Sequence, residues 1–177
     1  MIYLVRHGEA AASWGDHPDP GLSTLGQEQA ADVSTALCRL GATTVISSPM
    51  QRCRETAAPF AGQITAPLEI VAAISEIETP GHVTDRVSWL RTLMQSQWPV
   101  EMTPWRDGAL EAVNALPDGT AVFSHFVAIN AIAGKILDNE DVLIFKPGHC
   151  SITILERDTS GNLQVKALGQ SVETKVL

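Results

Sequence analysis

Short apolar runs alternate along the chain with longer segments in which apolar residues recur at helical spacing. The short runs predict buried strands, because each is rich in apolar or β-branched residues and ends near a turn signal; they lie at residues 2–5, 43–46, 68–71 and 120–124. The helical spacing predicts helices near residues 24–40, 49–60, 105–116 and 127–137. Near the end of the chain, a Thr-Ser-Gly-Asn turn between residues 152–155 and 163–166 predicts a hairpin.

Two of these helices carry sequence signals for their first residues. Thr24 and Gln27 have the spacing of a capping box, in which each side chain satisfies a backbone N–H of the first turn. Ser48 followed by Pro49 predicts an N-cap and a first helical residue.

Strands that alternate with helices are typical of an α/β fold, and we predict a three-layer α/β/α sandwich with a mostly parallel, mixed sheet. The 177 residues are enough for one domain with a sizeable core, and they contain no repeat, linker or low-complexity stretch. We therefore expect a single domain over residues 1–177. Its least regular segment, at about residues 77–106, predicts a helix with flanking loops that forms a small lid.

The net charge of −8 makes nucleic acid and anionic membrane unfavourable partners. The first predicted strand begins at residue 2, and we find neither a targeting segment nor a long uncharged apolar run, so we expect a cytoplasmic protein. The three cysteines have neither a disulfide pattern nor a metal-ligand spacing, and we expect buried thiols, no metal and no cofactor.

Polar side chains follow the predicted strands, at the edge of the sheet where α/β proteins bind ligands. The first strand ends in Arg6 and His7, and the second is followed by a helix whose first turn carries Arg52. Glu76 follows the third strand, and His125 follows the fourth. We expect these five side chains to converge on one crevice.

This set of side chains suits phosphoryl transfer. Arginine binds phosphate oxygens in pairs and stays charged at any working pH, and a helix N-terminus beside Arg52 adds backbone donors. A neutral histidine is a competent nucleophile towards phosphorus, and its ordinary pKa lies near neutrality. A nearby carboxylic acid can protonate the leaving oxygen.

Five short motifs in the same order resemble those of the histidine phosphatase superfamily, the group that includes cofactor-dependent phosphoglycerate mutases. The family's R-H-G-E stands at residues 6–9, L-S-T-L-G-Q-E-Q-A at 22–30 resembles its L-T-x-x-G-x-x-Q-A, its S-S-x-x-x-R-x-x-x-T-A stands at 47–57, I-S-E-I at 74–77 resembles its L-x-E-x, and its S-H stands at 124–125. The second motif matches with one residue of slack. The resemblance implies a phosphoglycerate mutase-like fold and points to the phosphatase branch of the superfamily.

The resemblance also implies roles for the candidate residues. His7 would attack phosphorus and become a phosphohistidine, while Arg6, Arg52 and His125 would hold the phosphate oxygens. Glu76 would protonate the leaving group and then activate water. The implied activity is metal-independent phosphomonoester hydrolysis by a histidine acid-type phosphatase, with a small phosphorylated metabolite or a phosphoprotein as substrate and phosphate as product.

Some positions depart from the family pattern and leave alternatives open. Ser13 stands where many members have Asn and is a candidate hydrogen-bond donor to the bound phosphate. Phe126 replaces the usual Gly after the second histidine and would narrow the pocket, stack on the leaving group or pack under a loop. Glu78 remains a second candidate for the acid. A phosphoglycerate mutase-type phosphotransferase and a phospho-ligand binding module with little turnover are the alternative functions, and the short segment between the third and fourth strands favours hydrolysis.

Overall fold

The computed structural model describes residues 1–12 and 17–171, and the strands of this part form one mixed sheet in the order β3-β2-β4-β1-β5-β6. The strands are β1 (Ile2–Arg6), β2 (Thr44–Ser47), β3 (Glu69–Ile70), β4 (Thr120–Ser124), β5 (Ile152–Arg157) and β6 (Leu163–Ala167). The first four pair in parallel, whereas β5 pairs antiparallel with both β1 and β6. The mostly parallel mixed sheet and the terminal hairpin are therefore confirmed.

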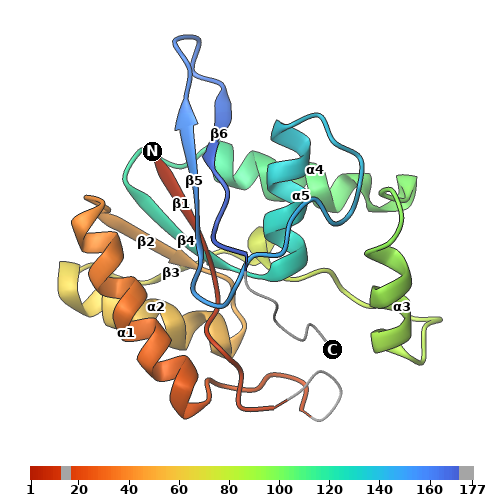
Figure 1. Cartoon of the computed structure of the whole chain (residues 1–177), viewed down its shortest axis with the longest axis horizontal. Coiled ribbons are helices and arrows are strands. Elements are labelled where there is room, and N and C mark those ends of the chain that lie inside the picture. Colours follow the sequence, from red (N-terminus) through yellow and green to blue (C-terminus); the bar gives the residue numbers. More distant parts are fainter. Residues whose placement is uncertain (13–16, 172–177) are drawn as a thin grey trace.

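Helices cover both faces of the sheet, which confirms the three-layer prediction (Figure 1). Helices α1 and α2 lie on one face, and α4 and α5 lie on the other, while α3 stands further out beside α5. The helices are α1 (Thr24–Arg39), α2 (Gln51–Ile64), α3 (Arg86–Leu93), α4 (Thr103–Asn114) and α5 (Phe126–Ile136), with 3₁₀ turns η1 (Ala72–Ile74) and η2 (Val100–Met102).

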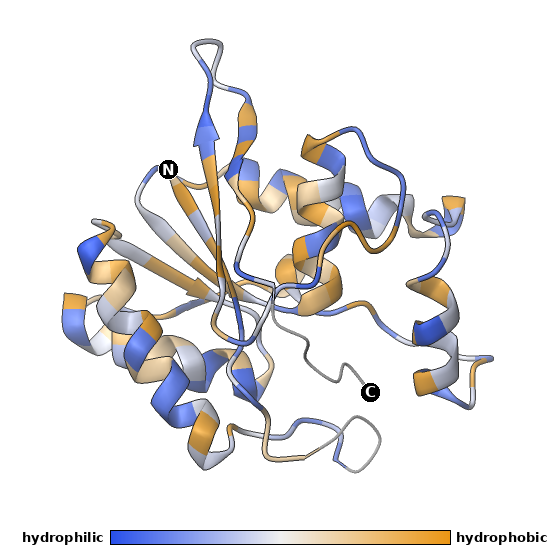
Figure 2. Cartoon of the chain, viewed as in Figure 1, coloured by the Kyte–Doolittle hydropathy of each residue, from blue (hydrophilic) through white to orange (hydrophobic). Residues whose placement is uncertain are grey.

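The alternation of side chains along β1 explains why both faces are covered. Tyr3 and Val5 pack into the cluster formed with α1 and α2, whereas Ile2 and Leu4 pack into the cluster formed with α4 and α5. A central parallel strand that is buried on both faces reads as a continuous apolar run. Helix α5 is coloured largely hydrophobic in Figure 2, and every residue of 126–134 is buried.

Both helix-start predictions are wrong by a small shift. Ser23, rather than Thr24, is the N-cap of α1, and its Oγ accepts a hydrogen bond from the Gly26 N–H at 3.0 Å. Helix α2 begins at Gln51, two residues later than predicted, and Ser48 does not cap it. Ser23 Oγ keeps this capping bond and also donates to Glu9 Oε1, whereas Ser48 Oγ pairs with His125 instead of capping α2.

The segment proposed as a lid packs against α5 through its own cluster of apolar side chains. Leu90, Leu93 and Trp98 contact residues of α5 in this cluster. One domain with a lid at about residues 77–106 stays a prediction. Over the described ranges, 1–12 and 17–171, no helix is both long and apolar enough to cross a membrane.

Candidate functional site

The parallel pairing of β1, β2 and β4 brings their carboxyl ends together, as the sequence predicts. Arg6 is in register with Ser124 across the β1–β4 pair, and the His7 N–H donates to the Ser124 carbonyl at 3.0 Å. His7 and His125 therefore leave adjacent strands at the same level. Their ring centroids are 5.4 Å apart, with the rings edge to face.

The environment of His7 fixes which ring nitrogen carries the proton. Its Nδ1 lies 2.8 Å from the Gly8 carbonyl oxygen, which can only accept, so Nδ1 carries the proton of the neutral ring. The lone pair is then on Nε2. Burial, followed by the charges of His125, Arg52 and Arg6, lowers the pKa of His7 well below its ordinary value. The ring is consequently neutral at neutral pH.

His125 is held between Arg52 and Ser48. The Nη2 of Arg52 lies 3.1 Å from Nδ1 of His125, and Ser48 Oγ lies 2.8 Å from Nε2. Because a guanidinium only donates, Nδ1 accepts, so the neutral ring carries its proton on Nε2 and donates to Ser48. Burial and then the charge of Arg52 lower the pKa of His125 well below its ordinary value.

Arg6 is fixed from two sides. Its Nη1 donates to the Pro147 carbonyl at 2.8 Å, and its guanidinium carbon lies 5.1 Å from the centroid of the Phe126 ring. Burial lowers the pKa of Arg6 to about 10, so it is still charged at neutral pH. Phe126 itself is only 1% exposed and contributes to the apolar cluster beside α3. A contact between Phe126 and substrate stays a prediction.

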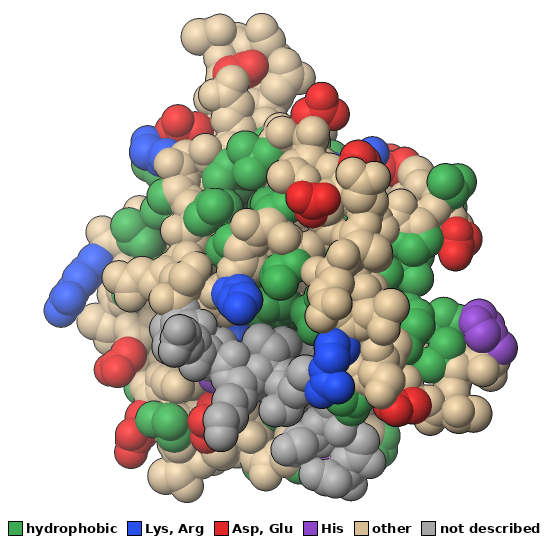
Figure 3. Space-filling model, turned by 45° about the vertical axis from the view of Figure 1, so that its right-hand side comes forward, with side chains coloured by type: hydrophobic (Ala, Val, Ile, Leu, Met, Phe, Trp, Pro, Cys, Tyr) green, Lys and Arg blue, Asp and Glu red, His purple; other side chains and the backbone are tan. Residues whose placement is uncertain are grey.

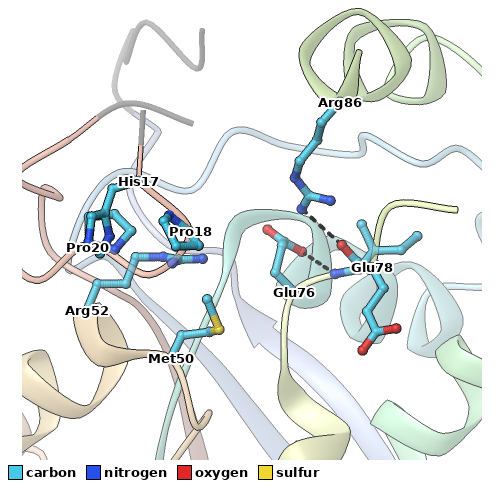
Figure 4. A pocket seen from close by; sticks show the side chains of 9 residues that line it. His17, Pro18, Pro20, Met50, Arg52, Glu76, Glu78 and Arg86 are labelled. Carbon is cyan, nitrogen blue, oxygen red and sulfur yellow. Dashed lines mark hydrogen bonds between the residues drawn. The ribbon is translucent and has the colours of Figure 1, made fainter. Parts of the chain in front are cut away.

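Glu76 sits at the N-terminus of α5. One carboxylate oxygen accepts from the N–H groups of Ile77 (3.1 Å) and Ala128 (3.2 Å), and the other accepts from the Val127 N–H at 3.1 Å. Burial is the largest influence on this carboxyl and raises its pKa, although these hydrogen bonds oppose the shift. Glu78 is exposed and its carboxylate points away from Glu76 in Figure 4, which favours Glu76 as the acid.

An open cavity of about 470 Å³ lies beside these groups (Figure 4). Arg52 of α2 and Arg86 of α3 extend into it from opposite sides, and Glu76 lies between them. The remaining lining residues are His17, Pro18, Pro20, Met50, Ile77 and Glu78. Arg86 could not be found from the sequence, because it belongs to no recognised motif and lies in the least regular segment.

The second motif acts on the site through the backbone of Glu9. The Glu9 N–H donates to Oε1 of Gln29 at 2.9 Å, and the Ser23 N–H donates to the Glu9 carbonyl at 2.9 Å. A Cβ added at Gly26 would lie 2.1 Å from that carbonyl oxygen. Only glycine lets α1 approach the loop that carries His7 so closely.

Other sequence candidates have mixed outcomes. The sequence favours a surface or capping role for His149, but its ring centroid lies 6.0 Å from that of His7, and burial lowers its pKa to about 4. Buried thiols are expected at all three cysteines; Cys53 is buried, and burial raises its pKa, whereas Cys150 is half-buried and the expectation is wrong for Cys38, which is exposed. Arg54, two residues after Arg52 on the same helix, is exposed. Ser13 lies outside the described residues.

The guanidinium groups of the site are buried in a protein with an acidic surface. Acidic side chains are scattered over the face shown in Figure 3, and basic ones reach the surface near its middle. Among residues 1–12 and 17–171, the Nε atoms of Arg6 and Arg52 are buried without a hydrogen-bond partner. No group of three or more His, Cys, Asp or Glu side chains in the same part of the chain could hold a metal ion.

Comparison with known proteins points to one superfamily. Residues 2–86 match the model of the histidine phosphatase superfamily (branch 1). An "Uncharacterized protein" of Mycobacterium tuberculosis is 42% identical over 67 residues, which are 36% of this chain and 33% of that protein, so the match covers a third of the relative. The "Probable phosphoglycerate mutase" of Escherichia coli O1:K1 is 27% identical over 162 residues, 77% of this chain and 74% of that protein.

Solved structures share the whole fold. The mycobacterial glucosyl-3-phosphoglycerate phosphatase has a TM-score of 0.78 at 16% identity, with 96% of this chain and 98% of that one covered. The phosphoserine phosphatase of Entamoeba histolytica, solved with 3-phosphoglyceric acid, has a TM-score of 0.76 at 19% identity, with 97% of each chain covered. At these identities the likeness establishes the fold alone.

Proposed function

We propose that this protein is a metal-independent phosphomonoester hydrolase of the histidine acid phosphatase type, which works through a phosphohistidine on His7. The observation that carries the proposal is the state of His7. Its Nδ1 proton is bound to the Gly8 carbonyl, so the lone pair of a neutral Nε2 is available within a cluster of two arginines and a second histidine.

The arginines supply the anion site in this proposal. Two buried guanidinium groups with unpaired Nε donors are costly to desolvate, and phosphate oxygens would offset that cost. An incoming phosphate would replace His125 as the hydrogen-bond partner of Arg52. The negative charge of the phosphate would also favour protonation of His125, so that both residues donate to phosphate oxygens.

The first step would form the Nε2–P bond and break the bond between phosphorus and the ester oxygen. The electron pair of that bond goes to the leaving oxygen, which takes its proton from the carboxylic acid of Glu76. A raised pKa keeps Glu76 protonated to higher pH than an ordinary carboxyl. The arginines and His125 would stabilise the charge that spreads over the phosphoryl oxygens.

The second step would return the enzyme to its starting state. Water attacks the phosphohistidine, the ionised Glu76 accepts the water proton, and the Nε2–P bond breaks with its electron pair returning to the ring. Phosphate is then released. The lowered pKa of His7 and the raised pKa of Glu76 both widen the acidic range in which a neutral nucleophile and a protonated acid coexist, which supports the acid-type assignment.

Trapping the intermediate tests the proposal. The protein is mixed with 4-nitrophenyl phosphate, quenched in alkali to preserve phosphohistidine, and analysed for phosphate on the peptide that contains His7. We expect phosphorylation in the wild type and none in His7→Ala. Aryl phosphate bound without turnover or phosphohistidine would favour the binding module. Transfer from the trapped enzyme to phosphoglycerate rather than water would favour the mutase, the activity named for the E. coli relative.

A further inference from the structure

The cavity beside Glu76 has a second cation on the side away from Arg52. Arg86, the first residue of α3, is half-buried and lines this cavity. Its guanidinium is oriented by donating to the Ile77 carbonyl at 2.9 Å and to Thr79 Oγ1. The group is therefore anchored to the loop that follows the proposed acid, and Figure 4 shows it directed towards the Glu76 side of the cavity.

The leaving group of a phosphomonoester would occupy this cavity, because its ester oxygen must reach Glu76. The volume of about 470 Å³ accommodates a small leaving group, and Pro18, Pro20 and Met50 provide apolar walls for its carbon skeleton. The carboxylate of Glu78 points away from the centre of the cavity. Arg52 is paired with Asp19 at 3.8 Å, so when Glu76 is protonated Arg86 is the cation that faces the leaving group on this side of the cavity.

We propose that Arg86 is a specificity-determining residue that binds a carboxylate carried by the leaving group. The inference deepens the proposed function and rests on it. A planar carboxylate accepts paired hydrogen bonds from a guanidinium, whereas a neutral hydroxyl group cannot. Arg86 also offsets the repulsion between such a carboxylate and Glu76 once the acid has given up its proton.

The charge of Arg86 acts on the groups of the proposed chemistry. It lowers the pKa of both Glu76 and His125, although burial has the larger effect on each pKa. A purely structural role, in which Arg86 only holds the loop at residues 77–79, would affect every substrate alike. A carboxylate-binding role instead affects the difference between a charged and a neutral leaving group.

A pair of matched ligands separates these roles. 3-Phosphoglycerate and glycerol 3-phosphate share a three-carbon skeleton and a phosphate. The first carries a carboxylate where the second carries a hydroxymethyl group. Their dissociation constants are measured by calorimetry in a His7→Ala background, where turnover does not interfere. The same measurement is made with Arg86→Gln, with Arg86→Lys and with Arg91→Gln, which removes an exposed cation of the same helix.

We expect 3-phosphoglycerate to bind about tenfold or more tightly than glycerol 3-phosphate, the gain of a charge-assisted hydrogen bond. Arg86→Gln should abolish this preference, Arg86→Lys should keep part of it, and Arg91→Gln should leave it intact. Equal affinities in the His7→Ala background, or a preference that survives Arg86→Gln, would overturn the inference. Failure of the proposed function would appear separately, as absence of turnover in the wild type.

Discussion

Glu76→Gln should separate the proposed acid from the rest of the site. As a general acid, Glu76 contributes most when the leaving oxygen is basic, and losing it should slow an alkyl phosphate by about 10²–10⁴-fold. An aryl phosphate such as 4-nitrophenyl phosphate leaves without a proton and should lose far less. The measurement is the ratio of kcat/KM for the two substrates in the wild type and in the variant.

The hydrogen bonds of Glu76 decide which substitution can be interpreted. Its carboxylate accepts three backbone N–H groups, and glutamine in the same rotamer keeps the two on Oε1 while the amide NH₂ opposes the Val127 N–H. One lost acceptor costs about 1–3 kcal/mol of stability, whereas alanine would remove the acceptor of all three N–H groups, two of them at the start of α5. Thermal unfolding therefore accompanies the kinetics.

Glu78→Gln is the matched control, because Glu78 is exposed and two residues away. It should leave the ratio of kcat/KM for the two substrates unchanged. The assignment of the acid is refuted if Glu76→Gln slows both substrates by the same factor, or if Glu78→Gln produces the selective loss instead.

Three further predictions test the nucleophile, the pH dependence and the support of the loop. His7→Ala should abolish hydrolysis of an aryl phosphate, while His82→Ala, at an exposed position, and EDTA should leave it unchanged; an active His7→Ala would contradict the nucleophile. The kcat/KM for an alkyl phosphate should fall at low pH as His7 becomes protonated, below its ordinary pKa, and at high pH as Glu76 ionises, above its ordinary pKa. Glu76→Gln should remove the high-pH fall, and its persistence would assign that limb to another group. Gly26→Ala places a Cβ 2.1 Å from the Glu9 carbonyl oxygen and should lower the free energy of unfolding by about 1–3 kcal/mol or more. Gly62→Ala, in open space within α2, should raise it by about 0.5–1 kcal/mol. Denaturant unfolding measures both, and an unchanged stability of Gly26→Ala would show that α1 can shift freely.

The layered fold and the converging strand ends could be predicted from the sequence. A run such as Tyr3–Val5 specifies a buried strand through local preference, and alternating strands and helices restrict the fold to a few arrangements. The parallel order then brings Arg6, His7 and His125 to one edge. These inferences depend on local pattern and on the general behaviour of parallel sheets, and the structure agrees with them.

Tertiary structure alone decided the partners of these side chains. Ser48 has the pattern of a helix cap but pairs with His125, 77 residues away, and the Arg86 side chain enters the cavity from a segment without a motif. The free energy of such contacts depends on which groups burial removes from water, and burial is a property of the assembled layers. The sequence therefore specified which chemical groups lie at the edge of the sheet, whereas burial beneath the packed helices and contacts with side chains such as Arg52 of α2 decided their protonation and orientation.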